Sequence, residues 1–144
     1  MELSDNKSTG SLAHDINFGT YRCAGTCTAN YGVSMDADGK VTNSATATLH
    51  LICGVAMETG AAGDVIRVQT GGFNNTLVTD GDVEAADLVL RVVNGGTFTG
   101  STESEMAADV TLGYHVIGIN IGVDVSTAGI CYIGKGPHGF GNDT

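Results

Sequence analysis

The side chains best able to do chemistry in this sequence are four cysteines and four histidines. The cysteines are Cys23, Cys27, Cys53 and Cys131, and the histidines are His14, His50, His115 and His138. A cysteine nucleophile needs a histidine base beside it, and such partners can meet only in the fold. Nothing beyond the presence of these residues indicates such a pair, and the histidines lack the HxxxH and HExxH spacings of zinc enzymes. We therefore expect no catalytic site.

The spacing of the cysteines also argues against a metal or redox centre. Cys23 and Cys27 are separated by three residues rather than by the two of a CxxC motif. On an extended strand that separation puts two sulfurs on one face but ~13 Å apart. In a reducing cytoplasm cysteines behave as small apolar side chains. We expect free, buried or half-buried thiols and no bound metal.

Three other patterns resemble ligand sites but have simpler explanations. The string from Gly134 to Gly139 satisfies GxGxxG, yet the chain given stops five residues later, with no helix to face a pyrophosphate. The segment from Asp36 to Gly39 resembles a calcium loop, but its glycine comes two places early and Ala47 stands where the closing acid should be. Turns and helix starts account for the carboxylates of Asp80, Asp82, Glu84 and Asp87. No cofactor is expected.

The charge balance restricts the partners. Sixteen acidic side chains face six basic ones, giving a formal net charge of −10. Nucleic acid is not an expected partner, because phosphate binding needs clustered Lys and Arg. The acidity either keeps the protein soluble or lets it work near DNA without binding it. No apolar run approaches the ~20 residues of a membrane helix, and Met1 to Ser11 lack a signal core. We expect synthesis and folding in a cytoplasm.

Length and glycine content predict one mainly β domain. The chain has 144 residues, with 22 glycines and a single proline. This composition is typical of many tight turns rather than long helices. Residues 1–17 are predicted to form a flexible arm, and 18–144 the domain. Strands are expected over 20–29, 31–35, 40–42, 47–57, 64–70, 77–79, 88–93, 97–99, 114–121 and 129–133. Short helices are expected over 83–87 and 101–109, the second with a capping box.

An internal sequence repeat indicates that the domain consists of two similar β units, over about 36–73 and 93–140. Each copy has a hairpin turn, a strand with a glycine, a loop of small residues and a final strand. Chance similarity between β-rich segments is the alternative explanation. Two such units packed face to face or side by side would form a small sandwich or barrel. Six glycines are predicted at its structural turns: Gly39, Gly54 and Gly63, matched by Gly96, Gly118 and Gly129. Further turns are expected at 71–72 and 80–81.

The last strand of the second copy is apolar on both faces. Ile130 and Tyr132 alternate with Cys131 and Ile133. In so small a protein one of these faces would need a neighbouring molecule to cover it. We therefore expect an oligomer or attachment to a larger surface.

These motifs resemble those of the tailed-phage proteins that decorate or cement the capsid. The similarity lies in the hairpin Ala37 to Thr42, the strand end Gly54 to Met57, the run Ala62 to Gly72, the element Val83 to Val89, and the segment Gly118 to Ile133. It covers roughly residues 31–136. The chain departs from the family in a longer insertion from Gly100 to Leu112, two extra residues between Gly118 and Gly129, and the amino-terminal arm.

The resemblance implies a mainly β, β-tulip-like fold that is often trimeric and binds the outside of the expanded capsid. The partners would be the major capsid protein and further copies of the chain, and the location the outer surface of the virion. The chain would then be a structural protein that stabilises the head against DNA pressure. The arm is expected to contact the capsid through Leu12, Ile16, Phe18 and Tyr21. The alternative is a virion fibre or a receptor- or glycan-binding β module.

Overall fold

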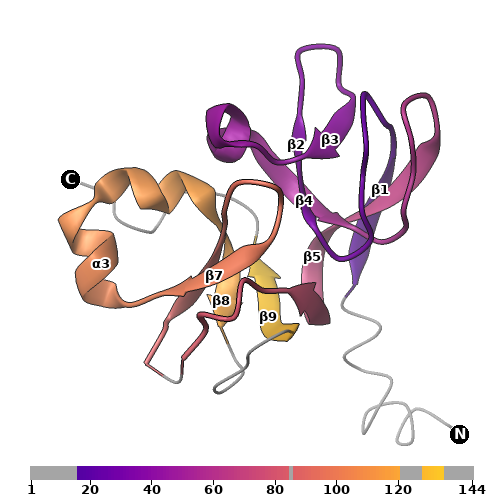
Figure 1. The fold of residues 1–144 in the computed structure, drawn as a ribbon. Coiled ribbons are helices and arrows are strands. Elements are labelled where there is room, and N and C mark those ends of the chain that lie inside the picture. Colours follow the sequence, from indigo (N-terminus) through magenta and orange to yellow (C-terminus); the bar gives the residue numbers. More distant parts are fainter. Residues whose placement is uncertain (1–15, 85, 121–127, 135–144) are drawn as a thin grey trace, which may run out of the picture.

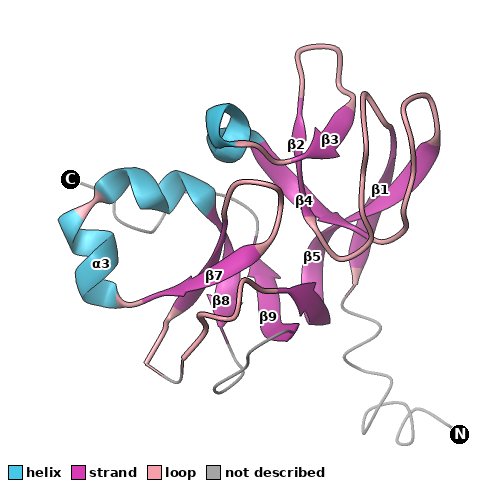
Figure 2. Ribbon diagram, viewed as in Figure 1, coloured by secondary structure: helices cyan, strands magenta, loops and turns pink. Residues whose placement is uncertain are grey.

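The mainly β class is confirmed. A computed structural model describes residues 16–84, 86–120 and 128–134 (Figure 1). The strands are β1 (Asn17–Arg22), β2 (Gly32–Met35), β3 (Val41–Asn43), β4 (Ile52–Ala56), β5 (Val65–Val78), β6 (Val89–Val92), β7 (Phe98–Ser101), β8 (Val116–Asn120) and β9 (Ala128–Gly134). The helical segments are short: α3 (Glu103–Ala108) and the 3-10 turns η2 (Thr46–Leu51) and η3 (Val110–His115) (Figure 2).

Hydrogen bonds connect the strands in the order β3-β2-β4-β5-β9-β8-β6-β7, and β1 also pairs with β5. All pairs between these strands are antiparallel. Since β3 and β7 stand at opposite ends of this order, the strands described do not close into a barrel. The order is symmetrical about the β5–β9 pair.

This order divides the described strands into two units with the same pairing scheme. In the first unit β2 pairs with β3 and β4, and β4 pairs with β5. In the second unit β6 pairs with β7 and β8, and β8 pairs with β9. A 3-10 turn precedes the third strand of each unit, η2 before β4 and η3 before β8. The described strands of the two units therefore share one topology.

Two of the three predicted glycine pairs occupy equivalent positions. Gly39 and Gly96 have φ angles of 78° and 97° and end turns with the same hydrogen-bond pattern. Gly54 lies opposite Val33, and Gly118 lies opposite Leu90 at the same register.

The third pair does not correspond. Gly63 precedes β5 in a turn with φ 94°, whereas Gly129 lies inside β9 opposite Leu77. Three of the six glycines predicted at turns are thus strand residues instead: Gly54, Gly118 and Gly129. Gly54 is needed for close packing, because a Cβ there would lie 2.3 Å from the Gln69 carbonyl oxygen.

Strand β5 corrects the predicted turn at 71–72. The chain continues as one strand of 14 residues, although Gly72 has a φ of 96°. Both halves of β5 have hydrogen-bonding partners: the first half pairs with β1 and β4, and the second half pairs with β9. Gly71 and Gly72 accommodate an irregular residue within the strand. Strand β5 therefore links the two units.

The predicted helices have different outcomes. The helix over 101–109 forms as α3, and its capping box is present: Glu105 N donates to Thr102 Oγ1, and Thr102 N donates to Glu105 Oε2. No helix forms in the described residues of 83–87. Val83 is buried in the core instead. The Asp87 carboxylate accepts a hydrogen bond from Glu84 N at 2.7 Å, and this bond closes a local turn. The strands predicted from 47 and 114 begin only at Ile52 and Val116, after the 3-10 turns.

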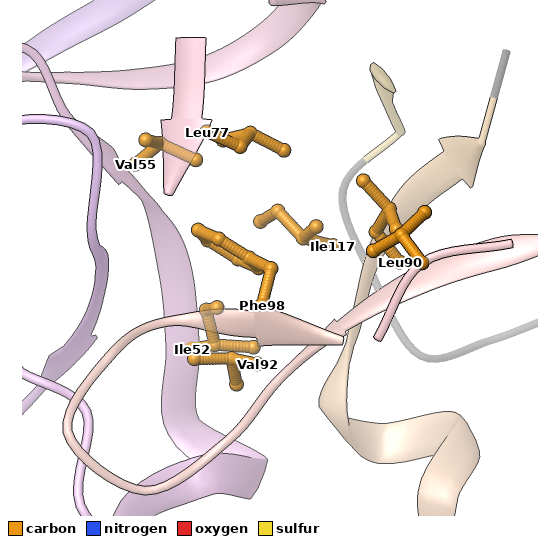
Figure 3. Close-up of a cluster of buried hydrophobic side chains, with 8 residues drawn as sticks. Ile52, Val55, Leu77, Leu90, Val92, Phe98 and Ile117 are labelled. Carbon is orange, nitrogen blue, oxygen red and sulfur yellow. The ribbon is translucent and has the colours of Figure 1, made fainter. Parts of the chain in front are cut away.

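The main hydrophobic core lies between the two units (Figure 3). Its members come from both: Ile52, Val55 and Leu77 from β4 and β5, and Leu90, Val92, Phe98 and Ile117 from β6, β7 and β8, together with Val83. A second cluster fills the first unit, and a third packs Met106 of α3 on Val89 and Val116. The apolar area removed from water between the units stabilises their relative position.

Candidate contact surface and polar cleft

The predicted capsid-contact residues take different positions. Leu12 lies outside the described residues. Ile16 borders a cleft beside β5, and Phe18 is 53% exposed at the start of β1. Tyr21 is half-buried and packs against the core cluster of the first unit. Of the three described residues, Ile16 and Phe18 are therefore the ones available for a partner.

Phe18 belongs to a surface on which apolar and basic side chains alternate. Strand pairing places Arg22 opposite Val65, and Thr20 opposite Arg67, so these side chains share one face of the sheet. Val65 is 56% exposed, and the Arg67 guanidinium lies 5.9 Å from the centroid of the Phe18 ring. We call Phe18, Arg22, Val65 and Arg67 the β1 surface. Sequence reasoning identified only Phe18, because the other three become neighbours through the β1–β5 register.

Hydrogen bonds hold the two arginines of this surface in place. Arg67 Nε donates to Glu58 Oε2 at 2.9 Å, and Arg22 Nη1 donates to the Gly63 carbonyl oxygen at 2.7 Å. The side-chain and backbone hydrogen bonds from Arg67 lower the pKa of Glu58 below its ordinary value. An exposed ion pair contributes little to stability, so its main effect is to orient Arg67 over the Phe18 ring.

A cleft of about 280 Å³ lies along β5. Its apolar lining consists of Ile16, Ala56, Met57 and Phe73, and its polar lining of Asn30, Gln69, Asn74, Asn75 and Thr76. None of these nine side chains is ionisable. The sequence contains no motif for this cleft, since its residues come from four separate segments.

The polar lining is held by a hydrogen-bonded network. Gln69 is only 2% exposed, and its Nε2 donates to the carbonyl oxygens of Gly71 and Phe73. Asn74 Nδ2 donates to Gln69 Oε1 at 2.8 Å, and Thr76 Oγ1 donates to Asn30 Oδ1 at 2.9 Å. The network fixes side chains from β5 and from the turn before β2.

The cysteines are closer together than the sequence predicted. Cys23 and Cys27 each form an isolated bridge, with Val41 and Gly60, so residues 23–27 are not one extended strand. Both thiols lie in the first unit's core cluster, against which Cys53 packs. The expectation of free, buried thiols is confirmed for Cys23 and Cys27, and Cys53 is half-buried as expected, while Cys131 falls where no side chain is described. In the part of the chain that the structure describes, no group of three or more His, Cys, Asp and Glu is arranged to hold a metal.

Cys27 is expected to resist alkylation in the folded protein. Burial, together with the neighbouring Cys23 thiol, raises its pKa to about 12, and only the thiolate reacts. We expect iodoacetamide at about pH 8, where an exposed thiol is partly ionised, to modify Cys27 only after unfolding, as read by peptide mass spectrometry. Because the folded pKa is the higher one, the thiol's contribution to stability is present at neutral pH and is lost as the pH rises through the interval from about 9 to about 12. Rapid labelling of Cys27 in the native protein would contradict the expected resistance to alkylation.

The remaining polar motifs are explained by turns. Asp36 Oδ1 accepts hydrogen bonds from the backbone N–H groups of Asp38 and Lys40, both at 2.9 Å, which closes the β2–β3 hairpin. Asp82, Glu84, Asp87 and Glu105 border a second hollow, where their hydrogen bonds are local. The GxGxxG string begins at the last residue of β9, and its remainder lies outside the described residues.

The fold defines a class: a small domain of two antiparallel β units that share a core and a long linking strand. No protein-family profile and no curated protein sequence matches this chain. Among solved structures it is similar to the N-terminal base of the head fibre protein gp8.5 of bacteriophage phi29, with a TM-score of 0.55 and 15% sequence identity. The similarity covers 84% of this chain and 96% of the phi29 chain, and it shows a shared fold. No helix in the described part of the chain is long and apolar enough to span a membrane.

Proposed function

We propose that this chain is a structural protein of a phage head that binds the outside of the mature capsid and stabilises it against DNA pressure. The observation that supports this most is the fold similarity over nearly all of a chain named as a head fibre base. The sequence motifs that resemble those of capsid decoration proteins also support this location. The role is non-catalytic, with the major capsid protein as partner.

The β1 surface is the proposed contact with the capsid. It exposes Phe18 and Val65 and carries two of the six basic residues of a chain whose net charge is −10. Aromatic residues and arginine are both enriched at protein interfaces. Residues 1–15, which precede β1, would extend this contact, for example by adding a strand to an exposed sheet edge of the capsid.

Binding to the assembled lattice alone is sufficient for stabilisation. A ligand that binds one state of an equilibrium stabilises that state by mass action, so a protein bound only to the intact shell opposes its separation. If the chain forms a trimer, as the resemblance implies, three weak contacts act together and raise the overall affinity.

Loading onto isolated, DNA-filled heads tests this role. We expect the full chain to co-sediment with heads and a chain lacking residues 1–15 to remain folded, because its β1–β5 pairing is intact, but to lose binding. Phe18→Ala should weaken binding by about tenfold, since an interface anchor contributes more than ~1 kcal/mol.

Leu88→Ala is the matched control, because Leu88 is similarly exposed but lies next to β6 in the second unit. Its binding should equal that of the parent. Full occupancy by the truncated chain would refute the arm contact, and absence of binding by the full chain would refute the proposed function.

A further inference from the structure

Two backbone irregularities meet at the cleft beside β5. Asn30 has a φ of 70° and is the one non-glycine residue with positive φ in the described ranges. In the β5–β9 pairing the register shifts between Asn74 and Leu77, which places one extra residue in β5. Thr76, within that bulge, is hydrogen-bonded to Asn30. Bulges re-aim side chains and are frequent beside functional sites, and unusual φ angles also concentrate at such sites.

The lining is chemically specific: its nine described residues are rich in amides and carry no charge. An amide side chain offers both a donor and an acceptor, which matches the two hydrogen-bonding roles of a hydroxyl group. Asn75 makes no side-chain hydrogen bond with the described part of the chain, and it is exposed at the cleft. Beside these amides lie the apolar side chains of Phe73 and Met57.

We propose that this cleft binds a neutral, polyhydroxylated ligand, of the chemical class of one or two carbohydrate rings. A phosphate, a nucleic acid or an acidic sugar would need a cationic side chain, and none of the described residues that line the cleft is cationic. A purely apolar ligand would cover the exposed Asn75 amide without giving it a hydrogen-bonding partner, which costs free energy. The volume of about 280 Å³ is near the lower limit for small-molecule pockets.

The network behind the cleft preorganises it for such a ligand. Gln69, which is buried, fixes Asn74 from behind, and Asn74 Oδ1 in turn accepts a hydrogen bond from Thr76 N at 2.7 Å. Groups held in place before binding lose little conformational freedom when a ligand arrives. This binding site would add a second activity to a capsid-bound protein, and it does not depend on the proposed capsid contact.

Titration of the full chain with glucose, galactose, N-acetylglucosamine and their short oligosaccharides, followed by backbone amide NMR, tests this proposal. We expect at least one neutral saccharide to shift the amides of Asn30, Met57 and residues 74–76 at millimolar concentration. Asn75→Ala and Thr76→Ala should each weaken that binding by about five- to tenfold, because each removes a hydrogen-bonding group from the cleft. Thr46→Ala, an equal hydroxyl deletion outside the cleft, should leave the affinity unchanged.

Four other results of the titration would contradict the proposal. Amide shifts only with sialic acid or inorganic phosphate would contradict the neutral ligand class. Shifts scattered outside the cleft, equal losses with Thr46→Ala, or no shift with any neutral saccharide would contradict the site itself. Amide spectra of the variants without ligand report whether a loss of binding comes from unfolding.

Discussion

Replacing Phe98 by alanine is expected to lower the free energy of unfolding by about 3–5 kcal/mol. Phe98 is fully buried, with 0% exposure, in the cluster shared by both units, where side chains of β4, β5, β6 and β8 surround it (Figure 3). Truncation removes a large apolar group and leaves a cavity that a core assembled from two units cannot fill by a local shift. A domain of this size has only about 5–15 kcal/mol of stability, so the variant should be marginal at 37 °C.

Chemical denaturation monitored by circular dichroism measures this effect, and Phe18→Ala is the matched control. It removes the same atoms from an exposed position, and it should change the unfolding free energy by less than about 1 kcal/mol. Equal losses for the two variants would show that the inter-unit cluster does not hold the domain together.

Gly54→Ala is expected to destabilise the domain by about 1–3 kcal/mol, although it adds a single methyl group. The new Cβ would lie 2.3 Å from the backbone carbonyl oxygen of Gln69 and 2.7 Å from a methyl of Val68. The first contact is with the backbone of β5, so β4 and β5 would have to move apart at the point where Val55 pairs with Gln69. Overpacking of this kind cannot be relieved by a side-chain rotation.

Gly71→Ala provides the comparison for this prediction. It is also a strand glycine, but a Cβ there would meet the side chain of Asn17 at 3.2 Å, which can rotate away. Thermal unfolding should show a large decrease in Tm for Gly54→Ala and a small one for Gly71→Ala. The reverse order would mean that the β4–β5 spacing is adjustable.

Local patterns in the sequence predicted much of the fold. The hairpin turns ending at Gly39 and Gly96 were predictable because a positive φ strongly favours glycine. Helix α3 was predictable from Thr102 and Glu105, whose capping box depends on residues three apart. The internal sequence repeat predicted two similar units, since equal turn spacing leads to equal strand pairing.

Features that depend on pairing between distant segments were not predictable. The turn expected at 71–72 is replaced by a continuous strand because β1 and β9 supply partners on both sides of it. Cys23 and Cys27 come together because the chain leaves β1 after Arg22. The polar cleft combines Ile16, the Asn30 turn and the β5 bulge, which are neighbours only in the fold. The β1 surface was found only in part for the same reason.

The proposed role is tested most directly by cryo-electron microscopy of the virions that the proposal assigns to this chain, prepared with and without its gene. The proposal predicts surface protrusions of the size of this domain, or of a small oligomer of it, at regular lattice positions in the first preparation and their loss in the second, with capsids that rupture more readily on heating. Identical shells in the two preparations would contradict it.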